Sequence, residues 1–115
     1  AIELDNIKDM NWGDTGVFRV GLTELDKNVD ELRGQCGYFY ECDLEELSPL
    51  TEIINPTYQT LTYFGVDKEK LQGLVCSNRV RGIDRIVPVG MGLDIGVIWD
   101  GYDVVRSLSR IIDLR

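Results

Sequence analysis

Apolar and polar residues are distributed along this chain in patterns that predict a series of short strands and helices. Between positions 15 and 23 every second residue is apolar, which predicts a strand with Phe18, Val20 and Leu22 on its apolar side. Residues 26–33 predict a short helix, with two apolar positions three apart. The first fifteen residues show no clean period. We therefore interpret residues 1–34 as an irregular, acidic lead-in with one possible strand.

The pattern becomes regular after this lead-in. The chain predicts strands at 36–41, 58–66 and 83–89, separated by amphipathic helices at 43–54 and 67–80. Such alternation with short loops predicts parallel strands joined by right-handed helical crossovers. The expected fold class is α/β, with strand-helix units and a mainly parallel sheet. Residues 35–115 form its βαβαβ unit, glycine loop and C-terminal helix, and residues 1–115 are a single domain or a fragment of one.

Local signals define the ends of these helices. Asp43, Asp67 and Asp103 are each placed to cap a helix N-terminus. Pro49 is expected to kink or restart the first helix because it has no backbone donor, and Gly82 to end the second. The last helix has an apolar stripe that is expected to be buried: Val104, Val105, Leu108, Ile111 and Ile112.

Composition narrows the class of protein. The chain has 115 residues, 43% of them hydrophobic, which suits one domain with a core. Its net charge is −8, with 13 acidic and only 4 basic residues before position 58, and this balance argues against nucleic-acid binding. No stretch predicts a membrane span or a secretory signal, so a cytoplasmic location is expected. The absence of histidine removes the commonest general base and metal ligand.

The three cysteines are the first candidates for chemistry. Cys42 precedes a predicted helix start, which lowers a thiol pKa, but the acidic residues around it oppose that effect. Cys36, Cys42 and Cys76 lack a Cys-x-x-Cys pair, a clear fourth zinc ligand and a histidine base. Reduced thiols that pack as small hydrophobic groups are the simpler interpretation.

Two loops offer weaker candidates. Gly90, Gly92 and Gly96 approach a dinucleotide fingerprint, but the last glycine comes one residue late and no good helix follows it. Asp94 and Asp100 match no calcium-loop spacing, and Asp103 is better placed as a cap, so no metal is expected.

Arginine and tryptophan residues provide the binding candidates. Arg79, Arg81 and Arg85 flank the third predicted strand, where they form either an anion clamp or a solvated helix end. Trp99, Asp100 and Gly101 lie at an expected strand-to-helix junction, where they line a pocket, anchor the last helix, or both.

The C-terminal third resembles a known family. Residues 82–90 (GIDRIVPVG), 98–103 (IWDGYD) and 107–110 (SLSR), with 58–65 (YQTLTYFG) before them, resemble the carboxyl end of acyl-CoA reductases. This family includes the reductase component of the bacterial bioluminescence fatty-acid reductase complex and is similar in fold to aldehyde dehydrogenases. The resemblance covers about residues 35–115.

The resemblance implies a C-terminal piece of the catalytic domain of a longer enzyme. Family members reduce fatty acyl-CoA to an aldehyde with NADPH through an acyl-thioester on an upstream cysteine, and the nucleotide domain also lies upstream. The chain alone is therefore expected to lack a catalytic residue, bind no cofactor and be inactive. The loop with Trp99, Asp100 and Gly101 would approach the substrate tunnel.

A piece of a larger domain has consequences for its surface. It should expose apolar side chains where the missing part packs, or form a homo-oligomer. The alternative function is a small α/β interaction or regulatory module that binds an anionic ligand through the arginines or the glycine loop.

Overall fold

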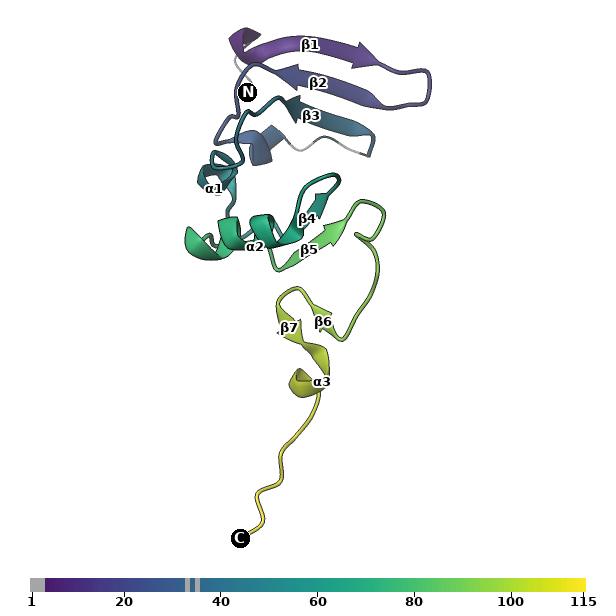
Figure 1. Ribbon diagram of the computed structural model, residues 1–115. Helices are drawn as coiled ribbons and strands as arrows, with labels where there is room; N and C mark the ends of the chain where they lie inside the picture. Colours follow the sequence, from purple (N-terminus) through teal and green to yellow (C-terminus); the bar gives the residue numbers. More distant parts are fainter. Residues whose placement is uncertain (1–3, 33, 35) are drawn as a thin grey trace. The chain divides into compact units, whose positions relative to one another are not determined.

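The computed structural model describes residues 4–32, 34 and 36–115 and divides into two compact units, at residues 1–53 and 54–115 (Figure 1). The predicted helix at 26–33 corresponds to a short 3-10 helix, η2 (Val29–Leu32), and its last residue, Arg33, lies outside the described residues. A further 3-10 turn, η1 (Leu4–Asn6), precedes the first strand. Within the described residues, no helix is long and apolar enough to span a membrane.

The first unit is built on a three-stranded sheet in the order β1-β2-β3 (Figure 1). The strands are β1 (Ile7–Trp12), β2 (Phe18–Leu22) and β3 (Tyr38–Cys42). β1 pairs with β2 antiparallel, and β2 pairs with β3 parallel. Val20 and Leu22 on β2 are buried, which confirms the apolar side predicted for this strand. β1 was not predicted. Almost all of its side chains are exposed, so burial imposes no alternation of apolar and polar residues on this strand.

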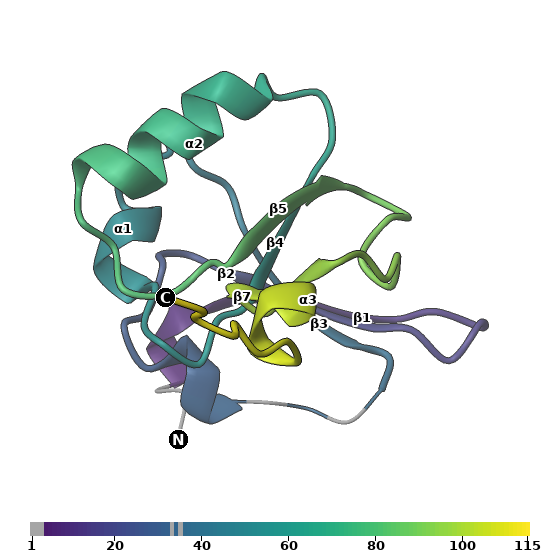
Figure 2. The same cartoon turned by 90° about the horizontal axis from the view of Figure 1, so that it is seen from below.

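The second unit contains a β-α-β unit of β4 (Thr60–Tyr63), α2 (Lys68–Ser77) and β5 (Arg85–Pro88). β4 and β5 pair in parallel, and α2 is the crossover between them, as the alternating pattern predicts. α2 lies against β5 (Figure 2). Its Leu71 is 3% exposed. A two-stranded antiparallel hairpin of β6 (Ile98–Trp99) and β7 (Tyr102–Asp103) follows.

The predicted order of strand, helix, strand, helix, strand is confirmed, but the single sheet is not formed. Mixed α/β content is present, with two parallel strand pairs distributed over separate small sheets. β3 pairs with β2 of the acidic lead-in, and β4 pairs with β5. The aromatic β3 thus satisfies its backbone groups against an earlier strand, a nonlocal pairing that periodicity alone does not specify.

Two predicted helices are shorter than expected. α1 (Leu50–Ile53) begins directly after Pro49, whose carbonyl accepts from the Glu52 N–H at 3.1 Å, so the expected restart is confirmed. Residues 43–49 are not helical, and Asp43 caps nothing there. The reason is that proline has no N–H to donate and disfavours helical backbone at the residue before it.

The last helix, α3 (Val104–Ser107), begins as predicted. Its N-cap is Asp103, whose Oδ1 accepts from the Arg106 N–H at 2.9 Å. The helix ends at Ser107, with Leu108 as its C-cap, and the following residues continue without regular structure (Figure 1). The stripe expected to be buried is instead largely exposed, with Ile111 at 90%. Without a packing partner, a helix of this length is not stable.

Asp67 allows a test of helix capping in α2. Its Oδ1 accepts from the backbone N–H groups of Glu69 (2.8 Å) and Lys70 (3.2 Å). Hydrogen bonding to the Glu69 side chain, and to the backbone of Lys70 and Glu69, lowers the pKa of Asp67. Its contribution to stability is therefore present above the unfolded-state pKa and is lost as the pH falls through the lowered pKa.

We expect Asp67→Ala to lower the thermal unfolding midpoint at pH 7, because an N-cap acceptor is removed. The gap to the parent chain should close at acidic pH, where the parent's carboxyl is also protonated. Asp67→Asn, which caps equally well without titrating, should keep the midpoint and lose part of the pH dependence. Circular dichroism from pH 7 to pH 2 measures the thermal unfolding midpoints of the parent chain and the variants. A difference between the parent and Asp67→Ala that is the same at every pH would contradict the prediction.

Candidate functional site

The Trp-Asp-Gly motif forms the tight turn of the β6–β7 hairpin. Trp99 pairs with Tyr102, which leaves Asp100 and Gly101 as a two-residue loop. Both have positive φ, 47° and 77°. This backbone is that of a type I′ turn, for which Asp-Gly is a preferred pair. The expected strand-to-helix junction is thus corrected: a second short strand, β7, lies between the motif and α3.

Arg85 contacts both the glycine loop and the hairpin. Its Nη1 donates to the Gly92 carbonyl at 2.9 Å, and its Nη2 donates to the Asp94 carbonyl at 2.8 Å. Its Cζ lies 4.5 Å from the centroid of the Trp99 ring, a cation–π distance. The charge and planar fork of arginine suit this combination of two acceptors and one aromatic face. Trp99 is half-buried beneath it.

The turn residues are also closely packed. A Cβ added to Gly101 would lie 2.9 Å from Oδ1 of Asp84, the residue before β5. Glycine is favoured at position 101 by its positive φ, and the Asp84 carboxylate lies close to it. The turn is thus flanked by the Asp84 side chain beside Gly101 and by Arg85 stacked on Trp99.

The three arginines predicted as an anion clamp have different environments. Arg85 directs two of its donors at backbone carbonyls, so they are not free for a ligand. Arg79 and Arg81 have exposed side chains, and Arg79 adopts a positive φ of 49° just after α2. The anion clamp involving Arg79 and Arg81 stays a prediction.

The glycine loop forms local turns and does not begin a helix. Its Met91 N–H donates to the Pro88 carbonyl at 3.0 Å, and its Asp94 N–H donates to the Met91 carbonyl at 3.1 Å, so these donors are used within the loop. A dinucleotide site needs a helix that begins at the glycines, and residues 90–97 lead instead into β6. These residues therefore lack the glycine-loop-to-helix arrangement of a dinucleotide site.

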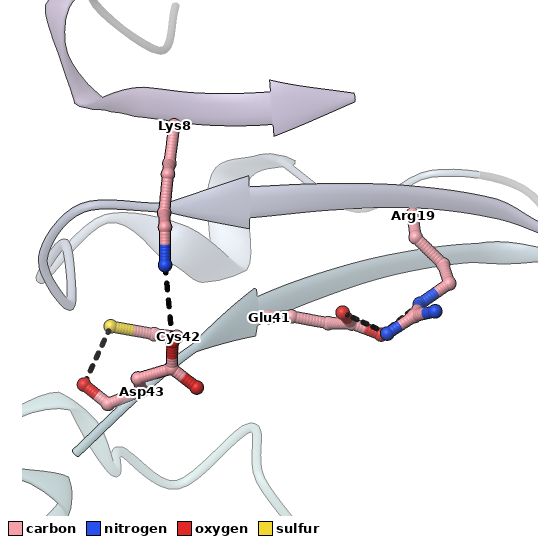
Figure 3. Close-up of polar contacts among 5 residues, drawn as sticks. All are labelled: Lys8, Arg19, Glu41, Cys42 and Asp43. Atoms are coloured by element: carbon pink, nitrogen blue, oxygen red, sulfur yellow. Dashed lines mark hydrogen bonds and ion pairs between the residues drawn. The ribbon is translucent and has the colours of Figure 1, made fainter. Parts of the chain in front are cut away.

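The cysteines are free thiols in the described residues. Cys36 and Cys76 are exposed, and Cys42 is half-buried at the end of β3. The Cys42 thiol contacts the Asp43 carbonyl at 3.8 Å (Figure 3). Among the described residues, no group of three histidine, cysteine, aspartate or glutamate side chains is arranged to hold a metal ion.

A pair of cross-strand ion pairs in the first unit was not predicted. Arg19 on β2 donates to Glu41 on β3 at 2.5 and 2.7 Å, and Lys8 on β1 contacts Asp43 at 3.3 Å (Figure 3). Hydrogen bonding to Arg19 lowers the pKa of Glu41, and the pKa of Arg19 is raised in return. In the parallel register Arg19 lies opposite Phe39, two residues before Glu41. Arg19 and Glu41 therefore become neighbours only once β2 and β3 are aligned. Their exposure makes them surface ion pairs with little effect on stability.

A shallow cavity of about 490 Å³ lies between α2 and β5. It is lined by residues of both elements and of the segment before β5: Lys68, Glu69, Gln72, Val75, Cys76, Ile83, Asp84 and Ile86. Of the residues around the Trp99 turn, only Asp84 contributes to it. The predicted pocket residues Trp99, Asp100 and Gly101 do not line this cavity.

Comparison of the chain with protein-family models, curated proteins and solved structures finds no match.

Proposed function

We propose that this chain is the C-terminal part of the catalytic domain of an aldehyde-forming acyl-CoA reductase. The residue pattern of segments 82–90 and 98–103, which resembles the end of that family, is the basis for the proposal. The structural observation that supports it most is the exposed apolar surface after α3. Ile111 and Leu114 are 90% and 94% exposed, which is costly in water unless another surface covers them.

The location of other exposed apolar side chains supports the same proposal. Leu93 and Ile95 in the glycine loop and Phe64 after β4 are also highly exposed. Among the described residues, the buried hydrophobic side chains are Val20 and Leu22 in the first unit and Leu71 in the second. A catalytic domain that supplies further packing surface would bury the exposed side chains of Leu93, Ile95 and Phe64.

The proposed reaction converts fatty acyl-CoA, NADPH and a proton to aldehyde, free CoA and NADP⁺. In the proposal, a cysteine of the upstream part attacks the thioester carbonyl, CoA leaves as its thiol, and the acyl group is held as a new thioester. The upstream part would also hold NADPH, whose hydride would reduce the acyl thioester to the aldehyde. We propose that the residues of this chain orient the substrate, with the Trp99 turn, which Arg85 contacts, beside the substrate tunnel.

The proposal is tested with the full-length product of the parent gene and the 115-residue chain side by side. NADPH oxidation is followed at 340 nm with short and long acyl-CoA, and again with NADH. We expect oxidation by the full-length protein that depends on acyl-CoA, and none by the 115-residue chain. No oxidation by the full-length protein under any of these conditions overturns the proposal.

A further inference from the structure

Arg85 joins three segments that are separate in the sequence of the second unit. It lies in β5, hydrogen-bonds to two carbonyls of the loop that follows this strand, and stacks on Trp99 of the β6–β7 hairpin. These three contacts come from one half-buried side chain.

The loop has few other means of holding its conformation. The amide hydrogen bonds of Met91 and Asp94 are local turns, which constrain neighbouring residues only. The side chains of Leu93 and Ile95 are exposed, so hydrophobic burial does not anchor them in this chain. Hydrogen bonds from a charged donor are stronger than neutral ones, and Arg85 provides two of them.

From this arrangement we infer that Arg85 is a positioning residue, which fixes the glycine loop against the Trp99 hairpin and thereby places the Asp100–Gly101 turn for the acyl-CoA substrate. The substrate role rests on the proposed function, whereas the positioning role rests on the contacts alone. Lysine cannot take over this role. Its single ammonium group lacks the planar fork that reaches two carbonyls while it stacks on an indole.

The positioning role is tested by hydrogen–deuterium exchange in the full-length product of the parent gene. The variants are Arg85→Lys and Arg85→Met, with Lys70→Met as the control, because Lys70 is an exposed cation on α2. We expect both Arg85 variants to raise amide exchange in residues 89–102 by about tenfold, since each loses hydrogen bonds to a charged donor. Exchange in β2 and the control variant should not change, which separates a local effect from unfolding.

The substrate role is tested by steady-state kinetics of the same proteins. We expect Arg85→Lys to raise KM for acyl-CoA by about tenfold, because a displaced turn weakens substrate binding, and to leave KM for NADPH unchanged. Wild-type exchange in Arg85→Lys overturns the positioning role, and raised exchange with an unchanged KM for acyl-CoA overturns the substrate role. An inactive wild-type enzyme overturns the proposed function instead, while the exchange data still decide whether Arg85 positions the loop.

Discussion

Replacing Leu71 with alanine is expected to lower the free energy of unfolding of the 115-residue chain by about 2–5 kcal/mol. Leu71 is 3% exposed and is the buried hydrophobic residue of α2. Its removal leaves a cavity where α2 packs on β5, and the described residues of the second unit have little other core to compensate. Urea denaturation followed by circular dichroism measures the change.

Leu114→Ala is the matched control for this prediction. Leu114 is 94% exposed, so the same chemical change removes almost no buried surface. Its effect should stay within about 0.5 kcal/mol, as is usual for surface substitutions. Equal effects of the two substitutions would mean that Leu71 is not part of a core.

Replacing Gly82 with alanine is expected to lower the free energy of unfolding by about 2–4 kcal/mol, through backbone strain and a steric clash. Gly82 has a φ of 132°, a region that side chains rarely adopt. A Cβ at this position would collide with the backbone carbonyl of Asn55, which cannot move away as a flexible side chain would. The unfolding midpoint in urea reports the loss.

Gly73→Ala provides a control of opposite sign. Gly73 lies inside α2 with open space around it. Alanine there should stabilise the chain by about 0.5–1 kcal/mol, because glycine is a poor helix former. Stabilisation by both substitutions would contradict the strained geometry at Gly82.

Local signals were sufficient for the α2 region of the fold. Asp67 was predicted as its cap, and the apolar residues beyond it define a stripe that contains Leu71. Both features depend on residues within a few positions of one another. The parallel pairing of β4 with β5 followed from the same βαβ pattern.

The partner of β3 could not be predicted in this way. Its aromatic alternation predicts a strand, but a strand can pair with any strand that presents a free edge. β3 pairs with β2, and the Arg19–Glu41 ion pair that results joins residues 22 positions apart.

The predicted length of the last helix was wrong for a different reason. The spacing of Leu108, Ile111 and Ile112 is helical, yet these side chains are exposed and the helix ends at Ser107. An amphipathic pattern states which residues should be covered but does not supply the covering surface. In the proposed function, that surface belongs to the rest of the enzyme.

The role of Trp99, Asp100 and Gly101 as site residues stays a prediction, whereas the hairpin that carries them was not predicted. The Asp-Gly pair between Trp99 and Tyr102 is a hairpin signal that sequence alone contains. The stacking of Arg85 on Trp99 spans fourteen positions and depends on how the glycine loop turns, so it required the structure.

Product stoichiometry of the full-length gene product tests whether this chain completes an acyl-CoA reductase, as we propose. The reaction contains a fatty acyl-CoA and NADPH, and aldehyde, free CoA and NADP⁺ are quantified together. We expect one aldehyde and one CoA for each NADPH oxidised. Release of CoA without aldehyde, or no reaction with either nicotinamide nucleotide, would contradict it.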